Sequence, residues 1–213
     1  MIRTIFLDMD GVIVDLVAGL QKSFPDWDGV PPIHDHLFIS EDDFWRKMIG
    51  LGTHWWSDLP EFPWSKQLVE TCEKVVGPEN VYILTSPGRT CVTTATGKLY
   101  WLQNHFPQFL REGRVVIGSQ KWLLAAPDRL LIDDTPQKCQ DFMSAGGWSI
   151  LVPGQVNNPR TLIGPDGQDY PVNLTVDEII ETLRMVVPRS LPRVDGLSSG
   201  GLSDLVDPGP SVD

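Results

Sequence analysis

The stretch Ile2–Asp8, with the sequence IRTIFLD, is a short apolar run that stops abruptly at a carboxylate, and Met9-Asp10-Gly11 follows it directly. Similar apolar runs recur further along the chain, and each stops at polar or turn-forming residues: Val81–Leu84, Val115–Ile117, Leu130–Ile132 and Ile150–Val152. Because the apolar residues are continuous rather than alternating, these runs are typical of strands that are covered on both faces.

Helical patterns separate several of these runs. One apolar helical face follows Ser65, and another is centred on Leu102. Thr135 stands as an N-cap before a proline, which predicts a third helix. Thr175 and Glu178 have the spacing of a capping box ahead of a fourth. This alternation of strands and helices predicts an α/β fold with a parallel sheet flanked by helices.

Two regions interrupt the alternation. Residues 24–64 contain no clear strand but hold five of the eight tryptophans, Trp27, Trp45, Trp55, Trp56 and Trp64. They stand where a small helical cap would be inserted after the first strand and its helix. Residues 188–213 are rich in Pro, Gly and Ser and predict a flexible acidic tail. We therefore expect a core formed by residues 1–23 and 65–187, a cap at 24–64 and a tail.

Composition limits the partners of the protein. Apolar residues make up 41% of the 213, enough for a real core, and 17 Lys and Arg against 28 Asp and Glu give a net charge of −11. That repulsion argues against binding to a nucleic-acid polymer or an anionic membrane. The three cysteines and the strand at the very start of the sequence lead us to expect a cytoplasmic protein without a leader peptide.

Polar side chains follow three of the predicted strands at the point where each strand ends: Asp8, Asp10, Thr85, Ser86, Asp133 and Asp134. The carboxyl ends of parallel strands meet at one edge of a sheet, where open α/β proteins bind ligands. Four carboxylates placed together repel one another unless they share a cation or a proton. Oxygen ligands without histidine or cysteine favour Mg²⁺.

The motifs resemble, in their order, those of the haloacid dehalogenase superfamily of aspartate-nucleophile phosphatases. They are DMDGV at Asp8–Val12, LTS at Leu84–Ser86, Lys121, and LIDD at Leu131–Asp134. The resemblance implies a Rossmann-like core with a cap.

A narrower resemblance covers about residues 1–150 and points to the 5′(3′)-deoxyribonucleotidases of that superfamily. It is carried by DMDGV, LTSPGR at Leu84–Arg89, GKLYW at Gly97–Trp101, LLIDD, and WWSDL at Trp55–Leu59. Leu16 stands at a position where that family often has a phenylalanine that faces the base.

The resemblance implies a role for each carboxylate. Asp8 is the nucleophile that forms an aspartyl-phosphate, and Asp10 is the general acid and base. Mg²⁺ is held by the Asp8 carboxylate, the backbone carbonyl of Asp10 and Asp133. Asp134 orients a metal-bound water or Lys121.

Hydroxyl and cationic side chains are the candidates for binding the phosphate. Thr85 and Ser86 can donate hydroxyl and backbone N–H hydrogen bonds at a strand end. Lys121, together with Lys98 or Arg89, would neutralise the remaining charge of a phosphate in this acidic chain.

The substrate pocket is expected in the cap, near Leu16. A nucleobase gains about 1–3 kcal/mol when it stacks on an aromatic face, so Trp55 or Trp56 could bind a base. The alternative is that both tryptophans form the core of the cap. A stacking pocket predicts a preference for nucleotides, whereas an aromatic core predicts none.

The resulting prediction is a Mg²⁺-dependent phosphatase that hydrolyses deoxyribo- or ribonucleoside monophosphates to nucleoside and phosphate. The rival of the same fold acts on another small phosphate ester, such as a sugar phosphate. The rival of another class is a non-catalytic protein that binds a nucleotide. The partner expected is the small nucleotide substrate, and the resemblance allows a homodimer.

Overall fold

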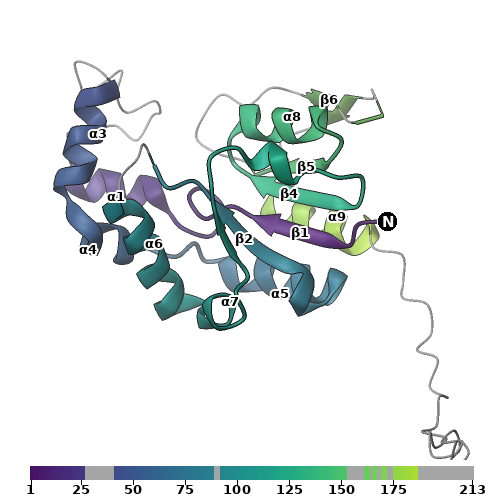
Figure 1. Ribbon diagram of the computed structural model, residues 1–213, viewed down its shortest axis with the longest axis horizontal. Helices are drawn as coiled ribbons and strands as arrows, with labels where there is room; N and C mark the ends of the chain where they lie inside the picture. The colour runs from purple at the N-terminus through teal and green to yellow at the C-terminus, as the bar shows by residue number, and fades with distance from the viewer. Residues whose placement is uncertain are drawn as a thin grey trace, which may run out of the picture.

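The computed structural model describes residues 1–26, 41–88, 92–152, 161–163, 165–166, 169–171 and 175–186. Within them, a five-stranded sheet has the order β3-β2-β1-β4-β5, and every neighbouring pair is parallel (Figure 1). Its strands are β1 (Thr4–Leu7), β2 (Val81–Thr85), β3 (Val115–Ile117), β4 (Arg129–Asp133) and β5 (Trp148–Leu151). The predicted α/β fold with a parallel sheet is confirmed.

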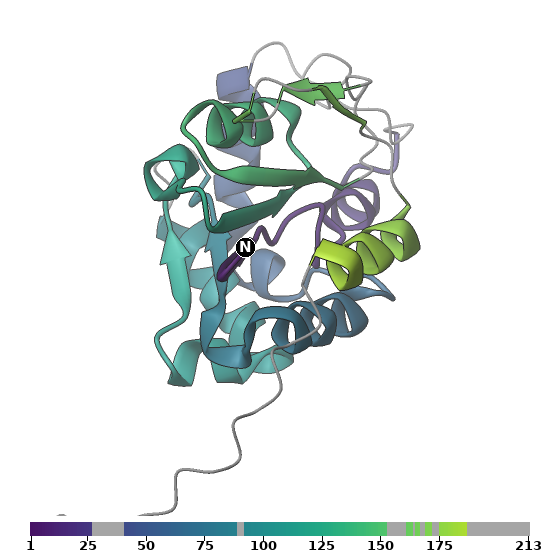
Figure 2. The same cartoon turned by 90° about the vertical axis from the view of Figure 1, so that its right-hand side faces the viewer.

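Helices cover both faces of this sheet. The described helices after residue 64 are α5 (Ser65–Val76), α6 (Val92–His105), α7 (Pro107–Arg111), α8 (Pro136–Ser144) and α9 (Val176–Val186). Two short 3₁₀ turns, η1 (Pro78–Asn80) and η2 (Lys121–Leu124), lie between them. In Figure 2, α5 and α9 lie on one side of the sheet and α8 lies on the other.

Strand β1 shows why its sequence is apolar without alternation. Ile5 and Leu7 are buried in the large core cluster that also holds residues of α5 and α9. Phe6, between them, points to the other face, where it meets Phe142 of α8 edge to face at a centroid distance of 6.3 Å. Both faces of the strand are therefore covered, so alternate polar positions would each bury an unsatisfied group.

Three further helices, α1 (Leu16–Ser23), α3 (Glu41–Gly50) and α4 (Gly52–Ser57), lie beyond the carboxyl ends of the strands (Figure 1). Helices α3 and α4 fall within residues 24–64, the segment predicted as a helical cap, whereas α1 directly precedes that segment. Residues 27–40 of the segment lie outside the described part of the chain. The exact division into core and cap stays a prediction.

A β-bridge and two hydrogen bonds, which we call the clasp, hold together the two ends of the chain segment that carries α1, α3 and α4. Val14 pairs with Glu61 in an isolated antiparallel bridge. The Asp15 N–H donates to the carbonyl of Pro60 at 2.8 Å, and the Ser65 hydroxyl donates to the carbonyl of Ile13 at 2.7 Å. The chain therefore leaves the core after β1 and returns to it at the same place.

Helix α6 approaches α4 very closely at Gly97. A Cβ built there would overlap Trp56 and would lie 2.7 Å from the backbone carbonyl oxygen of Thr53. The absence of a side chain thus lets α6 carry Lys98 up to the edge of the sheet.

Replacing Gly97 by alanine should lower the free energy of unfolding by about 1 kcal/mol. Alanine gains about 1 kcal/mol of helix propensity, but overpacking against a backbone atom costs about 1–3 kcal/mol. Urea unfolding measures the difference, with Gly50→Ala as control because an added Cβ at Gly50 meets nothing within 4 Å. Equal or higher stability of Gly97→Ala would show that α4 can move away at little cost.

The sequence predicted helix α9 near the carboxyl end of the chain but not the hairpin that precedes it. The capping box of α9 forms as expected: the Thr175 N–H donates to Glu178 at 2.6 Å, and the Glu178 N–H donates to the Thr175 hydroxyl at 3.2 Å. The small antiparallel hairpin of β6 (Thr161–Ile163) and β7 (Asp169–Pro171) was not expected, because its strands have only three residues each.

Among the residues that the structure describes, no helix has the length and apolar character needed to cross a membrane. The predicted acidic tail, residues 188–213, and Arg89 lie outside the described residues.

Candidate active site

The loop after β1 places two carboxylates at the edge of the sheet. The N–H groups of Val12, Ile13 and Val14 all donate to the carbonyl of Met9, which folds the loop tightly. Gly11 has a φ of +75°, and a Cβ there would overlap the carboxylate of Asp134. Glycine at this position therefore permits both the loop conformation and the close approach of Asp134.

Lys121 lies between two buried carboxylates. Its Nζ is 2.8 Å from Oδ2 of Asp8 and 2.6 Å from Oδ2 of Asp133, and at most 3% of each of the three side chains is exposed. The Met9 N–H donates to the other Asp8 oxygen at 2.8 Å. These contacts fix the Asp8 carboxyl group at the end of β1.

Asp8 is held in its ionised form. Burial by itself raises the pKa of this carboxyl. The nearby ammonium groups of Lys121, Lys138 and Lys98 outweigh burial, so the pKa of Asp8 lies well below its usual range. A buried but ionised carboxylate at a strand end has the character of a nucleophile.

Asp8, Asp133 and Asp134 form a carboxylate cluster in which one oxygen of each lies within 4.8 Å of the others. Burial and the charge of Asp8 raise the pKa of Asp133. Burial and the charges of Asp133 and Asp8 raise the pKa of Asp134 to about 8. Three hard oxygen donors that repel one another fit a divalent cation such as Mg²⁺, which would relieve this repulsion.

The structure brings Asp134 into the same cluster as Asp8 and Asp133, whereas the sequence suggested only an orienting role for it. Thr135 supports the pair: its N–H donates to Asp133 at 2.9 Å and its hydroxyl donates to Asp134 at 3.2 Å. The Thr135 hydroxyl, expected to cap α8, makes no capping hydrogen bond to that helix, which nevertheless begins at Pro136 as predicted.

Lys98 ties Asp10 to the end of β2. Its Nζ lies 2.6 Å from Oδ2 of Asp10 and donates to the Thr85 hydroxyl at 2.9 Å and to the Ser86 carbonyl at 2.7 Å. The other Asp10 oxygen and the Ser86 hydroxyl are buried and have no hydrogen-bond partner among the described residues. Both atoms therefore have hydrogen-bonding capacity that no described residue uses.

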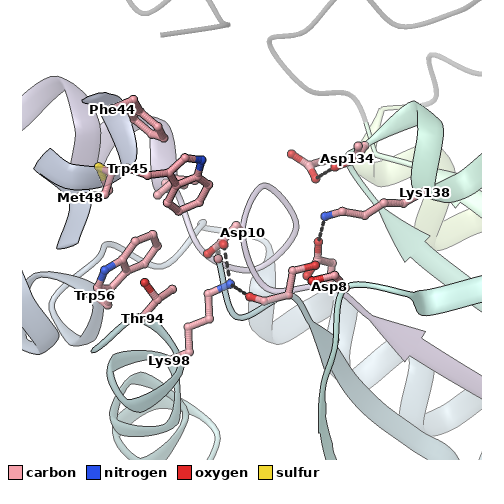
Figure 3. A pocket seen from close by; sticks show the side chains of 15 residues that line it. Asp8, Asp10, Phe44, Trp45, Met48, Trp56, Thr94, Lys98, Asp134 and Lys138 are labelled. Atoms are coloured by element: carbon pink, nitrogen blue, oxygen red, sulfur yellow. Dashed lines mark hydrogen bonds and ion pairs between the residues drawn. The ribbon is translucent and has the colours of Figure 1, made fainter. Parts of the chain in front are cut away.

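A cavity of about 420 Å³ opens beside these residues. One end is polar and contains Asp8, Asp10, Ser86, Lys98, Asp134 and Lys138. The other end is apolar and contains Leu16, Phe44, Trp45, Met48 and Trp56. Figure 3 shows the two ends facing each other, with Asp10 between the aromatic side chains of α3 and α4 and the Asp8–Lys138 pair.

The predicted pocket residues separate in the structure. Leu16 and Trp56 line the cavity, and Trp56 is also part of the core. Trp55 lines a different hollow together with Lys22 and Asp58, and its indole N–H donates to the Ser23 hydroxyl at 2.7 Å. Adjacent residues of a helix point about 100° apart, which agrees with the two tryptophans lining different hollows.

Thr85 and Lys121, two of the predicted phosphate ligands, are engaged in protein contacts and are not among the residues that line the cavity. The Thr85 side chain is fully buried and accepts from Lys98, while Lys121 lies behind Asp8. Ser86 and Lys98 line the cavity itself.

Sequence reasoning missed Lys138, Phe44, Trp45 and Met48, all of which line the cavity. Lys138 lies in the first turn of α8, and side chains there point back toward the preceding strand end. Pro136 marks the start of this helix in the sequence, so the direction of the Lys138 side chain could have been predicted from it. The three residues of α3 carry no motif, because only the packing of α3 decides which of its faces meets the cavity.

Known proteins add information on the fold. No family model and no curated protein matches the sequence. The solved structure of a haloacid dehalogenase-like family hydrolase from Xanthomonas campestris is similar, with a TM-score of 0.52 and 12% identity over 87% of this chain and 92% of that chain. A predicted phosphatase from Clostridium acetobutylicum is similar with a TM-score of 0.54 and 15% identity, over 87% of this chain and 100% of that chain.

Identities this low show similarity of fold, and the narrower resemblance to deoxyribonucleotidases stays a prediction. The parallel sheet, the helices on both of its faces and these two neighbours agree. The chain therefore has the fold of the haloacid dehalogenase-like hydrolases.

Proposed function

We propose that this protein is a Mg²⁺-dependent phosphatase that hydrolyses nucleoside monophosphates, preferably deoxyribonucleotides, through an aspartyl-phosphate on Asp8. The observation that carries the proposal is the cavity with two unlike ends. Its polar end holds an ionised carboxylate and lysines, and its other end is walled by aromatic side chains. A molecule that fits both has a phosphate at one end and a flat apolar group at the other.

In the first step an oxygen of Asp8 attacks phosphorus, and the bond between phosphorus and the leaving oxygen breaks. The electron pair of that bond goes to the leaving oxygen, which takes a proton from Asp10 and departs as the alcohol of the nucleoside. Oδ1 of Asp10 is suited to this role because it is buried in the cavity lining and makes no protein hydrogen bond among the described residues.

In the second step Asp10 removes a proton from water, and the resulting nucleophile attacks the phosphorus of the aspartyl-phosphate. The bond to Asp8 breaks and inorganic phosphate leaves, so the carboxylate of Asp8 and the acid form of Asp10 are restored. Lys98 keeps Asp10 in place through both steps by its contacts with Asp10, Thr85 and Ser86.

Asp8, Asp133 and Asp134 would hold Mg²⁺, which supplies positive charge against the oxygens of the phosphate and so reduces their repulsion from Asp8. Lys121 lies between Asp8 and Asp133, where its ammonium keeps their carboxylates close together. The Ser86 hydroxyl, which has no hydrogen-bond partner among the described residues, would donate to a phosphate oxygen in the cavity that Ser86 lines.

The apolar end favours a nucleobase over a bare sugar. Phe44 and Trp45 meet edge to face at 5.3 Å, and Met48 and Leu16 complete the wall. A sugar would place its hydroxyl groups against these apolar side chains and lose their hydrogen bonds to water. A planar base gains stacking energy there.

The test is phosphate release from matched substrates, namely deoxyribo- and ribonucleoside 5′-monophosphates, deoxyribose 5-phosphate and p-nitrophenyl phosphate, each with Mg²⁺ and with EDTA. We expect Mg²⁺-dependent turnover with a nucleotide as the best substrate. Turnover of sugar phosphates in preference to nucleotides would keep the catalytic part of the proposal and overturn the substrate. Absence of turnover on every ester would favour the non-catalytic alternative.

Trp45→Ala sharpens this test. Loss of a stacking partner should raise KM for a nucleotide about tenfold or more while leaving KM for deoxyribose 5-phosphate unchanged. Trp148→Ala is the matched control, since Trp148 is also half-buried but lies on β5 with its indole N–H donated to the carbonyl of Pro127. Equal effects on both substrates would argue against base stacking on Trp45.

A further inference from the structure

Three lysines of the described chain contact the carboxylates of the site, and two of them are fixed. Lys121 lies between Asp8 and Asp133 with 1% of its side chain exposed. Lys98, with 4% exposed, has three partners within 2.9 Å. Neither ammonium can reach a ligand without giving up short, buried contacts.

Lys138 is different. Its Nζ lies 3.5 Å from Oδ2 of Asp8 and 3.9 Å from Oδ1 of Asp133, and 29% of its side chain is exposed. These distances exceed those of a good charge-assisted hydrogen bond, so each contact is weak. The side chain reaches the cavity from the first turn of α8, opposite the aromatic end (Figure 3).

The ammonium of Lys138 lies next to the expected place of a divalent cation. Asp8 and Asp133 are two of the three carboxylates that fit Mg²⁺, and Lys138 contacts an oxygen of each. Lys121 already shares Oδ2 of Asp8 with Lys138, so a divalent cation would bring a third positive centre to these oxygens and strong repulsion with it. Lys138 has the longer contacts and the more exposed side chain, so it is the lysine that would withdraw when the metal enters.

The long lysine side chain can withdraw without leaving the cavity, because it has four rotatable bonds and its ammonium is a mobile point charge. The open space next to it is the polar end of the cavity, where the phosphate of the proposed substrate would lie. A withdrawn ammonium there meets an anion.

We propose that Lys138 is a substrate-binding residue that exchanges partners: it neutralises Asp8 and Asp133 in the metal-free protein, and it contacts the phosphate when Mg²⁺ is bound. This inference rests on the proposed function of the same site. It makes binding of the metal and binding of the phosphate depend on each other through one side chain.

The exchange predicts opposite changes in two affinities when Lys138 is replaced by methionine. Mg²⁺ alone should bind more tightly, because no ammonium has to be displaced. Inorganic phosphate, measured in saturating Mg²⁺, should bind about tenfold more weakly, because an ion pair to the phosphate is lost. A merely structural role for Lys138 would weaken both affinities or leave both unchanged.

Isothermal titration calorimetry of the full chain with Mg²⁺ alone, and then with inorganic phosphate in Mg²⁺, tests this. Lys138→Arg keeps the charge and should restore phosphate binding, and Lys138→Gln repeats the test with a polar side chain. Lys74→Met is the control, because Lys74 is 77% exposed on α5 and pairs with Glu70.

The outcomes separate the two proposals. Tighter Mg²⁺ and weaker phosphate in Lys138→Met, with phosphate binding restored by arginine, would support the exchange. If the wild-type protein binds both ligands, and Lys138→Met and Lys138→Gln bind them with the same affinities, the exchange alone is overturned. Folded wild-type protein that binds no Mg²⁺ would overturn the proposed function and the exchange together.

Discussion

Replacing Asp8 by asparagine should abolish phosphate release, with kcat lower by about 10⁴-fold or more. An amide oxygen is a poor nucleophile toward phosphorus and cannot form the aspartyl-phosphate. Asparagine has nearly the shape of aspartate, and its oxygen can still accept the hydrogen bond from the Met9 N–H, so the loop should keep its conformation. Release of inorganic phosphate from a nucleotide in Mg²⁺ measures the loss.

Asp141→Asn is the matched control, since Asp141 lies on α8 and accepts a hydrogen bond from Gln137 at 2.7 Å. It should keep full activity. Residual turnover within tenfold of the wild type in Asp8→Asn would mean that water attacks phosphorus directly and that Asp8 is not the nucleophile.

Replacing Lys121 by methionine should lower the free energy of unfolding by about 3 kcal/mol or more. The substitution keeps the volume of the side chain but leaves the buried carboxylates of Asp8 and Asp133 without their shared ammonium. Lys138, at 3.5 Å or more from either carboxylate, replaces only part of that charge. Urea unfolding in EDTA measures the loss of stability.

Two further measurements test the electrostatic cause of this loss. Adding Asp133→Asn to Lys121→Met removes one of the unpaired charges, so the double variant should be more stable than the single one. Mg²⁺ should stabilise Lys121→Met more than it stabilises the wild type. A loss below about 1 kcal/mol, as is typical of surface pairs, would show that water reaches these carboxylates.

The sequence was sufficient to predict the sheet and the place of the carboxylates. The strands are covered on both faces, so their apolar runs are continuous and easily distinguished from the helices. Asp8 and Asp133 each stand at the end of such a run, and parallel pairing of β1 with β4 then brings them together. These features depend on short stretches of chain and on one rule of sheet topology.

Other parts of the site depend on packing that no short stretch reveals. Whether Trp55 or Trp56 meets the cavity is decided by how α4 packs against α6, and Trp45 meets it because of where α3 lies. Lys138 lies five residues after Asp133, and only the start of α8 at Pro136 turns its side chain toward the site. Hydrophobic patterns assign residues to a buried face, but they do not show which buried face borders a cavity.

The clasp of Val14 and Glu61 has an evolutionary consequence. The bridge joins the two ends of the chain segment that carries α1, α3 and α4. The length and sequence of this segment can therefore change at little entropic cost to the rest of the chain. The aromatic wall of the cavity comes largely from that segment, while the carboxylates and lysines come from the edge of the sheet and the helices that pack on it. Mutations in this segment could therefore change which leaving group the cavity accepts, while the residues of the proposed phosphate chemistry stay the same.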